Sequence, residues 1–244
     1  MKNKNFILNK KYLSKKNFNV FKYDFRFVIN FLKKNNIKLN NQKILDAGCA
    51  NGSFLYFLKK NYPNNLYHGL DSDSNLLDLN KKNKSLKDIN FIKGSIEKNF
   101  SKQDYNLITC LGTLNIFKKQ EFILKNLFAH LHKKSFLIFN CYLNKSNIDV
   151  DINYKKNINH KKYIKNAIYI RSYQSIRKFL LQMKLHFFLM IPNPYPYAIK
   201  KSSGMNMYTL KVKDKNLRSN DLGILYDQYL IVAKKINLKF KFHL

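Results

Sequence analysis

The stretch Lys43-Ile-Leu-Asp-Ala-Gly-Cys-Ala-Asn-Gly-Ser-Phe54 predicts a short buried strand, a tight turn and the start of a helix. The strand is the apolar pair Ile44-Leu45, and it ends at the carboxylate of Asp46. Small residues recur at every second position of the turn: Gly48, Ala50 and Gly52. Glycine lets the backbone bend sharply and lets a ligand approach, and the unpaired amides of the following helix can receive a polar, nucleotide-like ligand. Such turns are common, so Asp46 is the residue that makes this one informative.

A second carboxylate follows one strand–helix–strand repeat later. The segment Leu66–Asp71 predicts a strand that ends at Asp71, which is 25 residues after Asp46. An acidic residue at this place can accept both hydrogen bonds of a ribose diol. The alternative role is a cap for the helix expected over residues 73–81, and Ser72 or Asp73 fits that role better.

The pattern of the first stretch, hhDxGxxxG, resembles motif I of the class I S-adenosylmethionine-dependent methyltransferases. The usual form is hhDxGxGxG, and here Ala50 replaces the middle glycine. The resemblance runs from about residue 40 to about 145, with a looser match to 235. It implies an α/β fold: a seven-stranded, mostly parallel, doubly wound sheet with an antiparallel C-terminal strand pair, in a three-layer α/β/α sandwich. A dinucleotide-binding fold is the rival, but its turn carries a second glycine and lacks the strand-1 carboxylate.

The resemblance also implies a methyltransferase with S-adenosyl-L-methionine as cofactor. After strand 3 the family often has an Asp that reaches the adenine, whereas this chain offers the Ser95 hydroxyl or the Ile96 backbone. Leu111, Gly112 and Asn115 match the positions past strand 4 that line the methionine end. The full cofactor-binding set implied is Asp46, Gly48, Cys49, Ala50, Asn51, Gly52, Asp71, Ser72, Ser95, Ile96, Leu111 and Asn115. No general base stands out among His160, Tyr142 and His186.

Hydrophobic periodicity organises the rest of the chain. We expect a basic N-terminal arm over 1–20 and a single domain over 21–244, with an insert near 145–170 and a C-terminal hairpin in 205–234. The expected helices cover 21–34, 53–60, 73–81, 121–132 and 172–184. The expected strands begin at Ile89, Asp104, Ser135 and Leu185, with others in 205–212, 215–218 and 226–234.

Composition narrows the function. The 244 residues carry a net charge of +32, but only four arginines: Arg26, Arg171, Arg177 and Arg218. Because phosphate recognition favours arginine and the lysines are spread evenly, we interpret the charge as compositional bias. The odd set of Cys49, Cys110 and Cys141 has no CxxC spacing, which predicts small buried residues and neither disulfides nor a metal site. No apolar run is long enough to span a bilayer, so we expect a cytoplasmic protein.

The acceptor half of the site is expected in the arm, the insert and the proline loop Asn193–Tyr197. These segments supply Tyr, Asn and Lys. They favour a polar small molecule or glycan precursor as methyl acceptor. RNA is the alternative, prompted by the lysines, and the oligomeric state is open.

Overall fold

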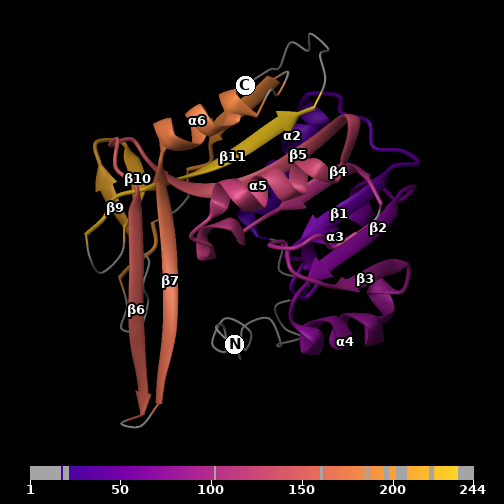
Figure 1. Ribbon diagram of the computed structural model, residues 1–244, viewed down its shortest axis with the longest axis horizontal. Helices are drawn as coiled ribbons and strands as arrows, with labels where there is room; N and C mark the ends of the chain where they lie inside the picture. Colours follow the sequence, from indigo (N-terminus) through magenta and orange to yellow (C-terminus); the bar gives the residue numbers. More distant parts are fainter. Residues whose placement is uncertain are drawn as a thin grey trace.

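The computed structural model describes residues 18, 22–101, 103–159, 162–183, 185, 187–194, 198–201, 208–219 and 223–235; of residues 154–159 and 162–166 it describes the backbone. The arm expected over 1–20 lies, except for Phe18, outside the described residues. Figure 1 shows a twisted sheet covered by helices, with a long two-stranded ribbon that extends away from it.

The central sheet has the order β3-β2-β1-β4-β5-β11-β8. All neighbours along this path are parallel except β11, which is antiparallel to both β5 and β8. This confirms the predicted doubly wound sheet with its antiparallel C-terminal pair. The strands are β1 (Lys43–Ala47), β2 (Leu66–Asp71), β3 (Ile89–Lys93), β4 (Tyr105–Cys110), β5 (Leu131–Asn144), β8 (Phe187–Pro192) and β11 (Asp227–Lys234).

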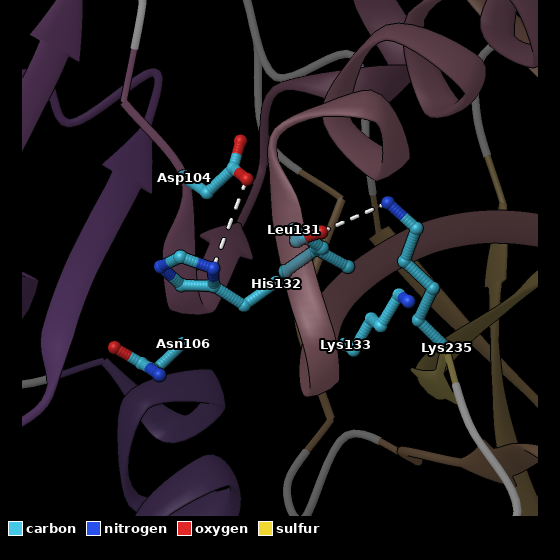
Figure 2. A pocket seen from close by; sticks show the side chains of 6 residues that line it. All are labelled: Asp104, Asn106, Leu131, His132, Lys133 and Lys235. Atoms are coloured by element: carbon cyan, nitrogen blue, oxygen red, sulfur yellow. Dashed lines mark hydrogen bonds and ion pairs between the residues drawn. The ribbon is translucent and has the colours of Figure 1, made fainter.

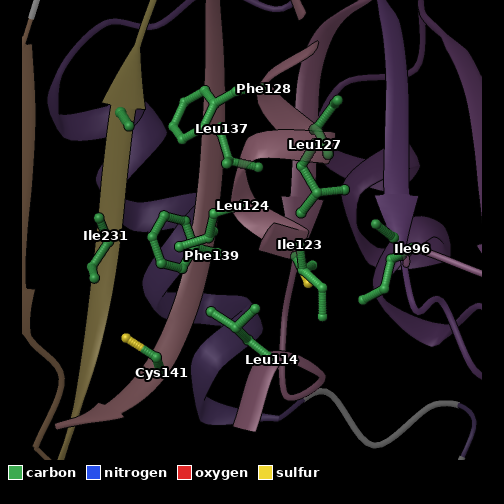
Figure 3. Close-up of a cluster of buried hydrophobic side chains, with 14 of the residues drawn as sticks. Ile96, Leu114, Ile123, Leu124, Leu127, Phe128, Leu137, Phe139, Cys141 and Ile231 are labelled. Carbon is green, nitrogen blue, oxygen red and sulfur yellow. The ribbon is translucent and has the colours of Figure 1, made fainter. Parts of the chain in front are cut away.

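Alternate residues of each strand enter two separate cores, because successive side chains of a strand point to opposite faces. Leu45 and Ile108 belong to the core under α5 and α6, whereas their neighbours Ile44 and Leu107 belong to the core under α2 and α3. Figure 3 shows the first core, in which Phe128, Leu137, Phe139 and Ile231 meet. The helices are α2 (Tyr23–Lys34), α3 (Ser53–Asn61), α4 (Ser74–Lys82), α5 (Gln120–Ala129) and α6 (Tyr173–Gln182), with 3-10 turns at Lys84–Leu86 and Leu114–Ile116.

Between β5 and α6 the chain forms the ribbon of β6 (Val150–Asn159) and β7 (Lys162–Ser172). The two strands are antiparallel, and the end of β7 pairs in parallel with β5 at Leu143 and Asn144. The buried Arg171 fixes the base of the ribbon, because it donates to Asp151 at 2.8 Å and to the Lys118 carbonyl at 2.7 Å. The expected insert near 145–170 is therefore a strand pair tied to the sheet.

In the C-terminal part, β9 (Tyr208–Val212) and β10 (Lys215–Ser219) form a separate two-stranded sheet. One expected helix end was wrong: α5 stops at Ala129 instead of residue 132, and β5 starts at Leu131 instead of 135. The reason is His130, whose ring binds the Asn126 carbonyl and the Ser101 carbonyl and so turns the chain at the helix end.

The three cysteines are buried and free, as the sequence predicted. Burial raises the pKa of each thiol, so none is a reactive thiolate. No group of three metal-ligating side chains occurs in the described part of the chain. No helix among the described residues is long and apolar enough to cross a membrane.

Candidate active site

The glycine turn after β1 is fastened to the end of β2. The amides of Gly48 and Cys49 both donate to the Leu70 carbonyl, at 2.8 and 3.0 Å, and the Ala50 amide donates to Asp71 Oδ2 at 2.9 Å. Left-handed backbone recurs through the turn, with φ of 82° at Gly48, 46° at Ala50 and 70° at Gly52. A Cβ on Gly48 would lie 2.3 Å from Thr113 Oγ1, so this glycine lets the loop after β4 close over β1.

The start of α3 has both paired and unpaired amides. The Gly52 amide donates to the Cys49 carbonyl at 2.9 Å, and the Ser53 amide donates to Asn51 Oδ1 at 3.3 Å. These two amides are satisfied within the turn, whereas those of Asn51, Phe54 and Leu55 have no acceptor among the described residues. A pyrophosphate needs such amides directed at it. The unpaired amides at the start of α3 are available to a polar ligand, and they do not by themselves distinguish a nucleoside from a dinucleotide.

Asp46 is a buried carboxylate at the end of β1, with 3% of its surface exposed. The Thr109 hydroxyl donates to its Oδ1 at 2.7 Å. The ion pairs found within the described residues do not include it. Burial raises the pKa of Asp46 to about 7, with a smaller rise from Asp71 and a lowering effect from Lys22. A buried carboxylate of this kind is stabilised by a cationic ligand.

Asp71 lies beside the turn, at the end of β2. Besides the Ala50 amide on Oδ2, its Oδ1 accepts the Asp73 amide at 2.9 Å. Each oxygen keeps a second acceptor position. Burial raises the pKa of Asp71. Asp73 caps α4 by accepting from the Asn75 amide at 2.9 Å, so the prediction that a residue other than Asp71 caps this helix is confirmed.

The predicted adenine contacts lie in the loop after β3. Ser95 Oγ accepts from the Glu97 amide at 3.2 Å, which leaves the hydroxyl proton available to a ligand. The carbonyl of the buried Ile96 accepts from the Asn126 side chain at 2.8 Å. The Ile96 amide donates to none of the described residues, so both predicted adenine contacts, the Ser95 hydroxyl and the Ile96 backbone, stay candidates.

Asn115 is engaged at both ends of its side chain. Its Nδ2 donates to the Tyr169 carbonyl at 2.9 Å, and its Oδ1 accepts from the Tyr142 amide at 3.1 Å. It thereby joins the 3-10 turn after β4 to both β5 and the ribbon. Leu111, the other predicted residue of this loop, packs against the core under α2 and α3.

A polar network that the sequence analysis missed lies beside the loop after β4. The Gly112 amide donates to Asn140 Oδ1 at 2.6 Å, and Asn140 Nδ2 lies 3.3 Å from Asp24 Oδ2. The fully buried Asn193 donates to Asp24 Oδ1 at 3.0 Å. We call Asp24, Asn140 and Asn193 the Asp24 network. Two signals in the sequence were available: Asp24 is the first acid of the chain, and Asn140 interrupts an apolar strand.

Of the three candidate bases, Tyr142 alone lies among the described residues. Tyr142 lies 5.0 Å, centroid to centroid, from Tyr226, beneath the Arg218 guanidinium at 5.4 Å. His160, His186, Tyr195 and Tyr197 lie outside the described residues.

A hollow of about 630 Å³ lies at the amino ends of the strands, where β4 and β5 begin (Figure 2). His132 Nδ1 lies 3.7 Å from Asp104 Oδ2, with both side chains about half exposed. Lys235 donates to the Phe128 carbonyl at 3.1 Å, which caps the end of α5, and to the Leu131 carbonyl at 2.8 Å. The glycine turn and Asp46 lie at the carboxyl ends of the strands, so this hollow is separate from the site around Asp46.

The family model described as "Methyltransferase domain" matches residues 38–184. The chain belongs to this family, the class I S-adenosylmethionine-dependent methyltransferases. No curated protein matches the chain.

Solved structures agree with the fold of the methyltransferase. An S-adenosylmethionine-dependent methyltransferase from Clostridium acetobutylicum is similar with a TM-score of 0.55 and 14% identity, covering 89% of this chain and 94% of that one. The precorrin-6y C5,15-methyltransferase from Geobacter metallireducens has a TM-score of 0.52 and 14% identity, covering 91% and 93%. The magnesium protoporphyrin IX methyltransferase from Synechocystis, solved with bound S-adenosylmethionine, has a TM-score of 0.52 and 14% identity, covering 86% and 78%. At these identities the likeness concerns the fold alone.

Proposed function

We propose that the methyltransferase binds S-adenosylmethionine at the carboxyl ends of β1 and β2 and transfers its methyl group to a polar small molecule or glycan precursor. The residues present fit this cofactor. Asp46 is a buried carboxylate suited to a cation, and Asp71 keeps acceptor positions for a ribose diol. The unpaired amides of Asn51, Phe54 and Leu55 can donate to a polar group of the cofactor.

Bound there, the cofactor supplies a methyl group activated by an adjacent sulfonium charge. The task of the chain is then to orient the two partners and to exclude water. Asp46 and Asp71 hold the cofactor half by charge and hydrogen bonds. The loop after β4, with Leu111 and Gly112, forms the boundary with the acceptor half.

The observation that carries the acceptor proposal is the Asp24 network. A carboxylate with two side-chain amides beside Gly112 offers hydrogen bonds to hydroxyl or amino groups, and it repels phosphates. Apart from its two chain neighbours, no described residue comes within 4 Å of a Cβ placed on Gly112, which leaves room next to this loop in the described part of the chain. The solved relatives take acceptors as different as precorrin-6y and magnesium protoporphyrin IX, so the fold does not decide the acceptor.

RNA is the second candidate acceptor, and the ribbon favours it. Residues 152–168 contain no acid and five lysines: Lys155, Lys156, Lys161, Lys162 and Lys165. The register places Lys155 opposite Lys165. Lysines clustered in sequence without acids attract a polyanion such as RNA.

Two measurements test the proposed function. Calorimetry should show binding of S-adenosylmethionine and S-adenosylhomocysteine, and none of NAD; binding of NAD alone would refute the cofactor assignment. Transfer of a tritiated methyl group into a cell extract, with and without RNase, separates the acceptors. Label in low-mass material supports the polar small molecule, whereas label that RNase removes identifies RNA.

A further inference from the structure

The first turn of α2 places the Asp24 carboxylate at the carboxyl ends of the strands, where the proposed cofactor and acceptor have to meet. The ring of Phe25 in α2 lies 4.9 Å, centroid to centroid, from that of Phe54, which follows the glycine turn, so the start of α2 lies near the end of β1. Asp24 accepts from Asn140 on β5 and from Asn193 after β8. The same Asn140 accepts from the Gly112 amide at 2.6 Å. Asn140 thus connects the Asp24 carboxylate to the loop after β4.

The geometry of the network leaves acceptor capacity on the carboxylate. Each Asp24 oxygen receives one amide hydrogen, at 3.0 or 3.3 Å, and a carboxylate oxygen can accept two. Asp24 is half-buried, so a ligand can reach it. The Oδ1 atom of Asn193 is buried without a hydrogen-bond partner among the described residues.

We propose that Asp24 is the acceptor-site base, which binds the hydroxyl or amino group of the acceptor and takes its proton during methyl transfer. The proposal rests on the proposed function. Asn140 and Asn193 position the carboxylate, with the open side of Gly112 beside it.

A weak base is sufficient for this proton transfer. The acceptor oxygen or nitrogen gains the methyl group, its proton passes to the Asp24 carboxylate, and the electron pair of the broken carbon–sulfur bond stays on sulfur. A methylated hydroxyl group that still carries its proton is a strong acid. An ordinary carboxylate within hydrogen-bond reach is therefore sufficient, and positioned bases contribute roughly 10²–10⁴-fold to rates.

The test compares Asp24→Asn with Asp24→Glu and with the control Glu121→Gln. Glu121 is the first-turn acid of α5, so its variant reproduces the loss of a charge near a helix N-terminus without touching the Asp24 network. Three readouts are needed: the melting temperature, S-adenosylhomocysteine affinity by calorimetry, and tritiated methyl transfer into an RNase-treated cell extract.

We expect Asp24→Asn to keep S-adenosylhomocysteine affinity within about twofold and to lower transfer about 100-fold or more. Asp24→Glu should recover part of the transfer, and Glu121→Gln should match the parent. If Asp24→Asn transfers label as the parent does, or if it loses S-adenosylhomocysteine binding or folding together with transfer, the proposal is overturned. If the parent protein binds no S-adenosylhomocysteine, the proposed function is refuted. That result differs from one in which the parent binds the ligand and only the role of Asp24 is refuted.

Discussion

Replacing Asp46 by Asn should stabilise the folded protein and weaken cofactor binding. Asn keeps an acceptor for the Thr109 hydroxyl, which lies 2.7 Å from Asp46 Oδ1, but it carries no charge. Burial raises the pKa of Asp46 from its ordinary value of 3.8 to about 7. Because one pKa unit corresponds to 1.36 kcal/mol, the ionised Asp46 costs the fold about 4 kcal/mol above pH 7.

The sign gives the pH window. The folded chain holds the Asp46 proton more tightly than the unfolded chain does, so this contribution favours folding below about pH 4 and is lost as the pH rises to about 7. Between pH 5 and pH 8 the loss is roughly 2.5 kcal/mol. For a chain of this size that corresponds to roughly 5–10 °C in melting temperature. Asp46→Asn should remove this dependence.

The assay is thermal unfolding of the ligand-free parent and variant at pH 5 and pH 8. We expect Asp46→Asn to melt higher than the parent at pH 8, with a smaller gap at pH 5. Asp88→Asn is the control, since Asp88 is exposed, pairs with Lys59 at 2.6 Å and has a lowered pKa, so it does not titrate in this range. A constant gap between the two curves, or an Asp46→Asn variant less stable than the parent at pH 8, would refute the reasoning.

Three further outcomes are expected. Asp71→Ala should weaken S-adenosylhomocysteine binding in calorimetry by roughly 2–3 kcal/mol, and it should also lower the melting temperature, because two backbone amides lose their acceptor; unchanged affinity would leave Asp71 a structural role alone. Ala50→Gly should be neutral or stabilising by up to about 1 kcal/mol in urea unfolding, and Ala50→Val destabilising, because φ at this position is 46°; the reverse order would contradict the left-handed turn. Asn115→Ala should cost roughly 1–3 kcal/mol of stability, since it leaves the Tyr169 carbonyl and the Tyr142 amide short of a partner; a larger effect on S-adenosylhomocysteine affinity than on unfolding would assign Asn115 to the cofactor instead.

The elements that carry the proposed cofactor half could be located from the sequence because its parts are local. Strand, acid, turn and helix follow one another within residues 43–61, and the apolar runs that define the strands lie close in sequence. Asp71 is reached by one repeat of the same unit. The satisfied amides of the turn could not be predicted, because they depend on the side-chain rotamer of Asn51.

The acceptor half depends on contacts between distant segments. The bonds from Asp24 to Asn140 and to Asn193 join residues 116 and 169 positions apart. Ribbon strands rich in Lys and Asn have weak strand propensity, so their pairing follows from tertiary anchors such as Arg171. Hydrophobic patterns and motifs in the sequence predict neither these long-range hydrogen bonds nor the anchoring of the ribbon.

Charge illustrates why the local structure has to be known. A chain with a net charge of +32 is expected to favour ionised carboxylates throughout, yet the pKa of Asp46 is raised. Burial is the largest cause of the shift, and exposed lysines beyond about 8–10 Å are screened by salt. The same reasoning applies to the proposed acceptor site: the overall charge attracts polyanions to the surface, but under the proposal the Asp24 carboxylate selects the group bound beside Gly112. A hydroxyl or amino group satisfies that carboxylate, and a phosphate does not.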